Sequence, residues 1–163
     1  MSKKSKHDKG STKTNAMRIL EDLNIEYIPH ELNTKITNGS ELARTFGIDP
    51  AKTFKTLVTI ANTKEYLVFL VPVDEKLSLK KAASAAGVKN VEMILQKDLF
   101  NRTGYVHGGC SPIGMKKSFR TFIDQSAENF DTILFSAGKI GEQIETDPKN
   151  LEKLSITFSD LTA

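Results

Sequence analysis

Residues 66–71 form an uninterrupted apolar run, Tyr-Leu-Val-Phe-Leu-Val, and this run restricts the possible fold more than any other feature of the sequence. A strand that is apolar at every position has two buried faces and lies inside a sheet. The preceding segment, residues 54–60, has the two-residue alternation of a strand, and residues 61–64 read as a turn. We therefore predict a central β-hairpin that is covered on both faces.

Lys55 is unusual in this context because it stands beside the start of a predicted central strand. An ammonium group in that position either reaches back to solvent along its aliphatic stem or lines a cleft where it meets an acceptor. Both interpretations remain open from the pattern alone.

The remaining periodicity predicts short helices and strands without regular βαβ alternation. Helices are expected at 14–24, 41–46, 78–87, 96–102 and after Asp147, and strands at 25–32, 91–95, 120–124, 132–136, 143–146 and 156–159. Pro29 favours an edge position for the strand at 25–32, and the strands at 120–124 and 132–136 read as a second hairpin. The expected fold is α+β, with a mixed, largely antiparallel sheet that curls towards a barrel and has flanking helices.

The formal charge of +3 is unevenly distributed. Residues 1–15 contain five lysines and one aspartate, whereas the remaining chain has 18 basic and 19 acidic side chains. We expect residues 1–13 to be a disordered basic tail and residues 14–163 to form one domain. The segment is either a solvated leader or an aid to polyanion binding. One cysteine, no apolar run of membrane length and no apolar signal core indicate a cytoplasmic protein.

Residues 103–117 have the composition of a functional loop. They include four of the ten glycines, the only cysteine and one of the three histidines. The pair Gly108-Gly109 ahead of Ser111-Pro112 predicts a tight loop with outward N–H groups, which can bind an anion or polarise a carbonyl. The alternative is an ordinary glycine-rich turn with a surface cysteine.

Several standard chemistries lack their motifs. The sequence contains no phosphate-binding glycine motif, no His/Cys metal spacing and no serine-hydrolase elbow, so we expect no metal and no cofactor. Cys110, three residues from His107, is a candidate nucleophile, but an isolated cysteine is more often a small buried apolar residue. His30 either faces a pocket or is a structural strand residue.

Three segments together carry a family resemblance. Residues 54–57 (Phe-Lys-Thr-Leu), the glycine-rich residues 103–117 and residues 136–139 (Ser-Ala-Gly-Lys) resemble the YbaK family of free-standing aminoacyl-tRNA deacylases. These proteins are relatives of the editing domain inserted in bacterial prolyl-tRNA synthetases. The resemblance covers about residues 14–161, and the GG-x-SP-x-G-x-KK form is more similar to the Cys-tRNA(Pro) branch than to the Ala-tRNA(Pro) branch.

The resemblance implies release of cysteine from mischarged Cys-tRNA(Pro). In the family the substrate thiol is thought to attack its own ester carbonyl, giving a cyclic thioester, so that the enzyme needs no nucleophile. The implied partners are aminoacylated tRNA and prolyl-tRNA synthetase. The site residues that we expect are the catalytic Lys55, Gly108 and Gly109, the substrate-binding His30, Ser111, Gly114, Ser136 and Gly138, and the tRNA-binding Lys116, Lys117 and Lys139.

The sequence departs from the family pattern at a few places. Relatives often have an aliphatic residue at the position of Cys110, which favours a packing role for this cysteine. Near Leu32 and Gln143 some relatives have a tyrosine and an acid, so the pocket wall is expected to differ here. The alternatives are a deacylase of another small aminoacyl-tRNA, Ala or Ser, and a binding module for tRNA or a synthetase that lacks catalysis.

Overall fold

The computed structural model describes residues 13–163, so all but the last residue of the predicted basic tail lies outside the described part. The strands are β1 Ile28–Glu31, β2 Phe54–Ala61, β3 Tyr66–Pro72, β4 Val91–Met93, β5 Arg120–Asp124, β6 Ile133–Lys139, β7 Glu142–Thr146 and β8 Ile156–Ser159. The α-helices are α2 Asn15–Asp22, α3 Gly39–Phe46, α4 Leu79–Ala86 and α5 Leu99–Thr103. Short 3₁₀ helices are η1 Pro50–Lys52, η2 Gln96–Asp98, η3 Gln125–Asn129 and η4 Pro148–Leu154.

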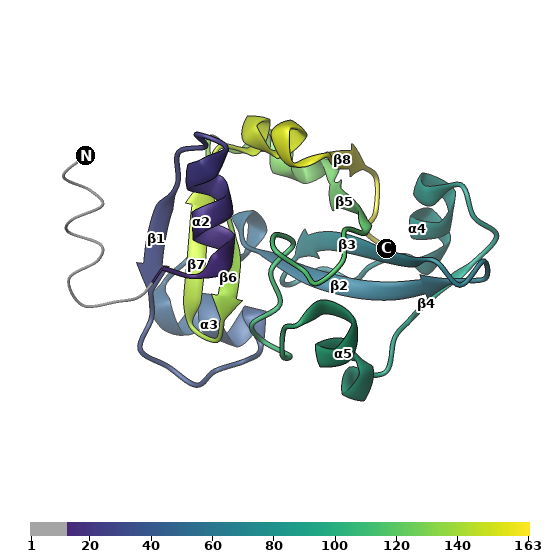
Figure 1. Ribbon diagram of the computed structural model, residues 1–163. Helices are drawn as coiled ribbons and strands as arrows, with labels where there is room; N and C mark the ends of the chain where they lie inside the picture. Colours follow the sequence, from purple (N-terminus) through teal and green to yellow (C-terminus); the bar gives the residue numbers. More distant parts are fainter. Residues whose placement is uncertain (1–12) are drawn as a thin grey trace.

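The strands form two sheets, with the orders β4-β2-β3-β5-β8 and β1-β7-β6 (Figure 1). Four strand pairings are antiparallel and two are parallel, which confirms the α+β class and the largely antiparallel pairing. The sheets meet at one isolated bridge between Thr53 and Leu134. A barrel requires an unbroken ladder around the axis, and here neither sheet closes on itself.

Strand β3 is the centre of the larger sheet, as the apolar run predicts. Its residues 67–71 have no measurable exposure. Val68 and Leu70 belong to one apolar cluster, and Leu67, Phe69 and Val71 belong to a second cluster that includes the alanines of α4. The predicted hairpin of β2 and β3 is confirmed, with Lys55 opposite Val71 in the ladder.

The predicted hairpin of residues 120–124 and 132–136 is wrong. Strand β5 lies between β3 and β8 and is parallel to both, whereas β6 pairs with β7. The buried Asp124 explains the difference, because one carboxylate oxygen accepts the Ser126 N–H and caps η3. The other oxygen accepts the Leu161 N–H, so the chain leaves the sheet at this point instead of turning back.

The three-stranded sheet is covered on one face by α2 (Figure 1). Thr14 caps this helix, and Ala16, Met17 and Leu20 are buried in the same apolar cluster as Phe135 and Ile144. The opposite face of this sheet carries polar side chains. No helix within residues 13–163 has the length and apolarity needed to cross a membrane.

Candidate active site

The strand register puts three polar residues side by side across the three-stranded sheet. His30 of β1 pairs with Gln143 of β7, which pairs with Ser136 of β6. Directly opposed residues in an antiparallel ladder project to the same face. Because the sequence neighbours Phe135 and Ile144 point into the core, these three residues lie on the polar face.

Lys55 belongs to the same face through the junction between the two sheets. The bridge between Thr53 and Leu134 is parallel, and Lys55 and Ser136 each follow it by two residues, so we expect their side chains to project to the same side of the junction. Phe54 packs in the core cluster below β6, which directs the next residue to the other side. His30, Gln143, Ser136 and Lys55 are called the polar row below.

Lys55 is only partly exposed, and its surroundings perturb its charge. Burial lowers the pKa of its ammonium group, while Asp74 and Glu75 partly oppose this effect and Lys76 adds to it. These three residues follow β3, the strand whose Val71 lies opposite Lys55. The lysine that sequence analysis singles out therefore stands at one end of a polar face. Its catalytic role stays a prediction.

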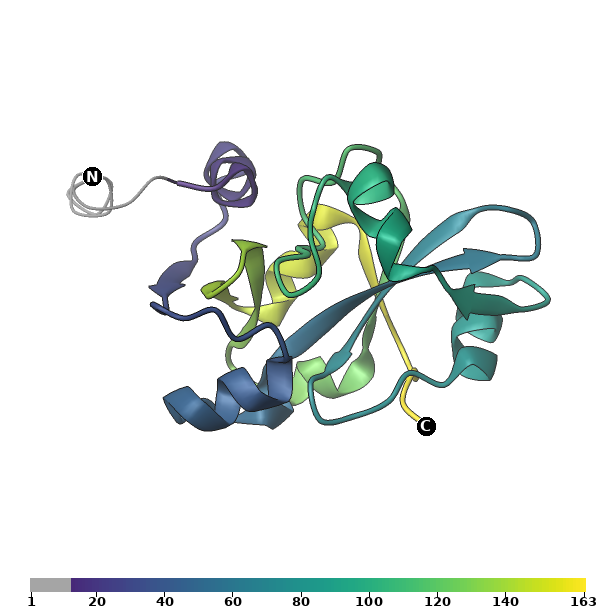
Figure 2. The same cartoon turned by 90° about the horizontal axis from the view of Figure 1, so that it is seen from below.

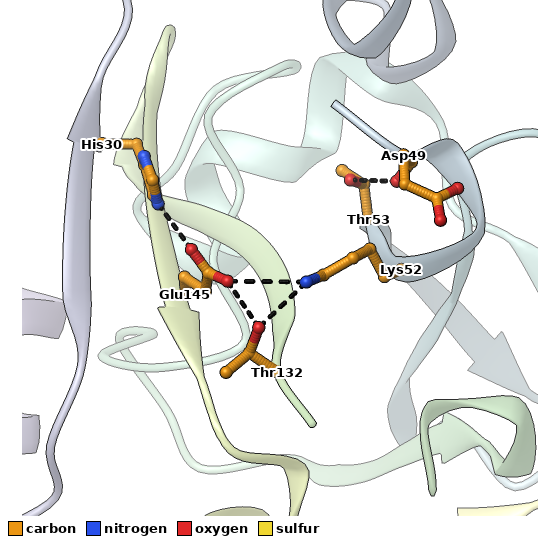
Figure 3. Close-up of polar contacts among 6 residues, drawn as sticks. All are labelled: His30, Asp49, Lys52, Thr53, Thr132 and Glu145. Carbon is orange, nitrogen blue, oxygen red and sulfur yellow. Dashed lines mark hydrogen bonds and ion pairs between the residues drawn. The ribbon is translucent and has the colours of Figure 1, made fainter. Parts of the chain in front are cut away.

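The other end of the polar row contains a hydrogen-bonded carboxylate (Figure 3). Glu145 Oε1 lies 2.8 Å from His30 Nε2, and its Oε2 accepts from the Thr132 hydroxyl and lies 3.5 Å from Lys52 Nζ. Lys52 also donates to the Thr132 hydroxyl at 2.9 Å. The hydrogen bond from Thr132 is the largest cause that lowers the pKa of Glu145. Desolvation acts the other way, and His30 and Lys52 lower the pKa further, so that the net shift is downward.

Sequence analysis missed Glu145, Thr132 and Lys52. One signal was available, since Gln143 and Glu145 are two residues apart in a predicted strand and must share a face. That face became recognisable as polar only with the pairing to His30.

The glycine turn, Gly108 and Gly109, lies against the end of the strand pair that carries Ser136 and Gln143. A Cβ added at Gly109 would lie 3.1 Å from the amide nitrogen of Ile140 and 3.3 Å from Cα of Lys139. Figure 2 shows the loop after α5, in teal to green, beside the lime ribbon of β6 and β7. Two motifs that are about 30 residues apart in sequence therefore meet in the fold.

The two glycine amides are not equivalent. The Gly109 N–H donates to the Val106 carbonyl at 3.0 Å, and this hydrogen bond closes the turn. This N–H is therefore already used, whereas the sequence predicted that it would face a ligand. Within residues 13–163, the N–H groups of Gly108 and Cys110 have no hydrogen-bond partner. These two amides, rather than the glycine pair, are the candidate donors to a developing oxyanion.

Three of the expected substrate-binding residues have contacts within the loop. The buried Ser111 hydroxyl accepts the Ile113 N–H at 3.3 Å. Gly114 and Gly138 both lie against Tyr105, whose hydroxyl donates to the Ile113 carbonyl at 2.5 Å. These contacts shape the loop, and direct substrate binding by Ser111, Gly114 and Gly138 stays a prediction.

The three expected tRNA-binding lysines are exposed. Lys116 Nζ lies 5.2 Å from the ring centre of Phe100, and its alkyl chain lies near Gly104. Lys117 follows it in the same loop, and Lys139 ends β6 next to Gly109. Lys116 therefore stands at Gly104 and Lys139 at Gly109 of the same loop, and the binding of the three lysines to tRNA stays a prediction.

Cys110 is poorly suited to act as a nucleophile. Its side chain is 7% exposed in the main core cluster, and burial raises the pKa of its thiol to about 12, although a hydrogen bond with Thr103 acts the other way. The thiol therefore stays protonated at neutral pH, which supports the packing interpretation. The described residues contain no cluster of His, Cys, Asp and Glu that could hold a metal ion.

Comparison with known proteins identifies the family of this chain. The model of the aminoacyl-tRNA editing domain family matches residues 35–154. The chain belongs to this family, and the predicted family and enzyme class, an aminoacyl-tRNA deacylase, are confirmed.

One relative is similar in sequence, and two solved structures are similar in fold. The "Putative Cys-tRNA(Pro)/Cys-tRNA(Cys) deacylase EbsC" of Enterococcus faecalis is 42% identical over 159 residues, covering 94% of this chain and 96% of that protein. A solved structure described as "a putative trans-editing enzyme for prolyl tRNA synthetase" has a TM-score of 0.78 and 22% identity, over 94% of this chain and 99% of that chain. The "hypothetical protein APE2540" has a TM-score of 0.83 and 18% identity, over 90% and 97%. The structural likenesses show the shared fold.

Proposed function

We propose that this protein releases cysteine from mischarged Cys-tRNA(Pro) and that the substrate thiol performs the displacement. Three observations support the proposal. Lys55 and Ser136 each follow the bridge between Thr53 and Leu134 by two residues, the glycine turn packs on the end of β6, and the thiol of Cys110 is buried with a raised pKa. The 42% identity to a protein named for Cys-tRNA deacylation supports the substrate choice.

In this reaction the cysteine sulfur forms a bond to its own ester carbonyl carbon. The tetrahedral intermediate then breaks the bond between that carbon and the ribose oxygen, which takes the proton released by the thiol. The products are a cyclic thioester and free tRNA. The protein contributes orientation and charge stabilisation, with the Lys55 ammonium at the ester end and the free amide of Gly108 directed at the oxyanion.

Prolyl-tRNA synthetase is the proposed partner because residues 14–163 have almost no net charge with which to select a tRNA. A bound synthetase would supply the tRNA specificity, and the exposed Lys116, Lys117 and Lys139 would contact the tRNA backbone. The proposed location is the cytoplasm, where charged tRNA is used.

A panel of charged tRNAs tests the proposal. The protein is incubated with Cys-, Ala- and Ser-tRNA(Pro) and with Cys-tRNA(Cys), with and without prolyl-tRNA synthetase, and released amino acid is measured. We expect turnover of Cys-tRNA(Pro) and none of tRNA(Pro) charged with 2-aminobutyrate, which has the size of cysteine but no thiol. Equal release of 2-aminobutyrate would exclude thiol assistance, and binding without any release would favour the non-catalytic module.

A further inference from the structure

The buried Gln143 has an unsatisfied acceptor in the middle of the polar row. Gln143 is 7% exposed, and its side-chain oxygen Oε1 has no hydrogen-bond partner among the described residues. An unpaired buried oxygen costs free energy, and such atoms are rare in folded proteins. This oxygen is therefore a candidate to accept a hydrogen bond from a ligand.

The neighbouring side chains do not supply the missing donor. Ser136 makes its one hydrogen bond with the Gly138 N–H, which donates at 3.1 Å. His30 is bound at Nε2 by Glu145, a carboxylate whose lowered pKa keeps it ionised at neutral pH. Because a carboxylate can only accept, Nε2 carries the hydrogen, so in the singly protonated ring Nδ1 is the acceptor that faces away from Glu145. This end of the row is therefore rich in acceptors.

The charges of the row have an order. Lys55 supplies a positive group at the β2 end of the row. Glu145, two residues after Gln143 on β7, contacts His30 with one oxygen and Lys52 with the other (Figure 3). A ligand cation is repelled by the Lys55 ammonium and finds acceptors at Gln143 and His30. One strand spacing, roughly 4.8 Å, separates Gln143 from Ser136, which suits the short span from an α-amino nitrogen to its ester group.

We propose that Gln143 Oε1 and His30 Nδ1 bind the free α-amino group of the aminoacyl ester, and that Glu145 acts as a positioning residue through His30. This inference rests on the proposed function. With the amino group bound there, the ester carbonyl is directed to Ser136, Lys55 and the glycine turn. The substrate class is then narrower than aminoacyl esters in general. The site accepts aminoacyl-tRNA with a free amino group and rejects tRNA whose amino group is acylated, as in a peptidyl-tRNA.

The first test needs no mutation. Release of cysteine from Cys-tRNA(Pro) is compared with release of N-acetylcysteine from N-acetyl-Cys-tRNA(Pro), which keeps the thiol and the ester but loses the cationic amine. We expect kcat/KM to fall about 10- to 100-fold on acetylation, the value of a hydrogen bond to a charged group. Equal rates on both substrates would overturn the inference and leave the proposed function intact, whereas no release from Cys-tRNA(Pro) would remove the proposed function itself.

The second test replaces Gln143 by two residues of similar length. Gln143→Met removes the acceptor and should lower kcat/KM for Cys-tRNA(Pro) about 10- to 100-fold, with little change for the acetylated substrate. Gln143→Glu keeps acceptors only and should retain activity. If Gln143→Glu were inactive and Gln143→Met active, the side chain would not be an acceptor for the amine. Thermal unfolding of both variants confirms that the comparison is made on folded protein.

The third test separates positioning from structure. Glu145→Gln should raise KM several-fold and leave kcat nearly unchanged, because His30 loses its fixed tautomer. The variant should also change the pH profile of kcat/KM. Glu31→Gln, at an exposed position on β1, the edge strand that also carries His30, removes one carboxylate charge and should alter neither the KM nor the pH profile. A Glu145→Gln variant with wild-type KM and pH profile would contradict the role of this carboxylate.

Discussion

The two sheets differ in their side chains: the five-stranded sheet contains a strand that is apolar on both faces, whereas the three-stranded sheet carries the candidate site. In the five-stranded sheet, β3 is buried under apolar side chains on both faces, and α4 covers the face of Leu67, Phe69 and Val71. In the three-stranded sheet, α2 covers the apolar face, and the other face carries the polar row. A sheet that is apolar on both faces offers no polar groups to a substrate, so the sheet with one polar face is the natural place for a site.

Lys55 stands where the two arrangements meet. Its strand β2 is part of the apolar five-stranded sheet, but the bridge at Thr53 brings its start beside β6. The backbone of Lys55 is therefore anchored in the sheet with the buried central strand, while its side chain is assigned to the polar face. Rigid support of this kind is what a positioned catalytic group requires.

Removing a large side chain from the covered sheet should have the largest effect on stability. Phe69 is fully buried and stacks on Phe122 at 5.3 Å, so Phe69→Ala should lower the free energy of unfolding by about 3–5 kcal/mol. Denaturant unfolding measures this change, and the activity of the folded fraction should stay within about twofold. Phe100→Ala is the control, since Phe100 is 54% exposed and its loss should cost little. Equal costs would contradict the comparison.

Changing the polar face should give the opposite result. Lys55→Met keeps the length of the side chain but removes the ammonium, and should lower kcat/KM about 100-fold, or about 2.7 kcal/mol. The free energy of unfolding should stay the same or rise, because a partly buried charge is replaced by an apolar group. Lys80→Met, at an exposed position on α4, should leave both quantities unchanged. Wild-type turnover by Lys55→Met would remove the proposed role of Lys55.

The sequence predicts the covered sheet better than the polar face, for a physical reason. An apolar run such as residues 66–71 and caps such as Ser78 with Gly87 act within a few residues, so they can be recognised locally. The parallel pairs of β5 with β3 and β8 join distant segments, and the loop chemistry between them does not specify the partner. Local reasoning favoured a hairpin there and was wrong.

The candidate site was also only partly predictable from local sequence patterns. Lys55, the glycine turn and Ser136 lie in recognisable motifs, whereas His30 is noticeable only as a histidine in a predicted strand. The polar row depends on the register of β1, β7 and β6 and on the bridge that brings β2 beside β6. Glu145 carries no motif, and only its contact with His30 reveals it.

Crowding the glycine turn should produce an intermediate effect. In Gly109→Ala the new Cβ would press on the backbone of Lys139 and Ile140 at 3.1–3.3 Å, which moves the turn away from β6. We expect kcat/KM to fall about 10-fold, or about 1.4 kcal/mol, through misplaced groups. Gly87→Ala is the matched control, since no atom lies near its Cβ but its φ of +71° strains an alanine. It should lower stability alone. An active Gly109→Ala variant would show that the turn tolerates displacement.

The pH dependence of the free energy of unfolding should contain a small contribution from Glu145. The pKa of Glu145 is lower in the folded protein than its ordinary value of 4.5, so its stabilisation is complete above that pH and is lost as the pH falls through the folded pKa. Glu145→Gln should therefore cost under about 1 kcal/mol at pH 7. The difference from wild type should shrink below pH 4.5, as measured by denaturant unfolding at several pH values. A difference that grows on acidification would reverse the assigned sign.

Cys110→Ala should have the smallest effect on activity. Its thiol is buried beside apolar neighbours with a pKa near 12, so it neither attacks an ester nor contacts the polar row, and turnover of Cys-tRNA(Pro) should match wild type. The loss of one buried sulfur should cost no more than about 1 kcal/mol in unfolding. Alkylation of Cys110 by iodoacetamide at pH 7 should be slow in the native protein and fast in denaturant. A folded Cys110→Ala variant with strongly reduced turnover would restore the enzyme nucleophile, and the division of labour between the two sheets would then have to include a catalytic group from the core.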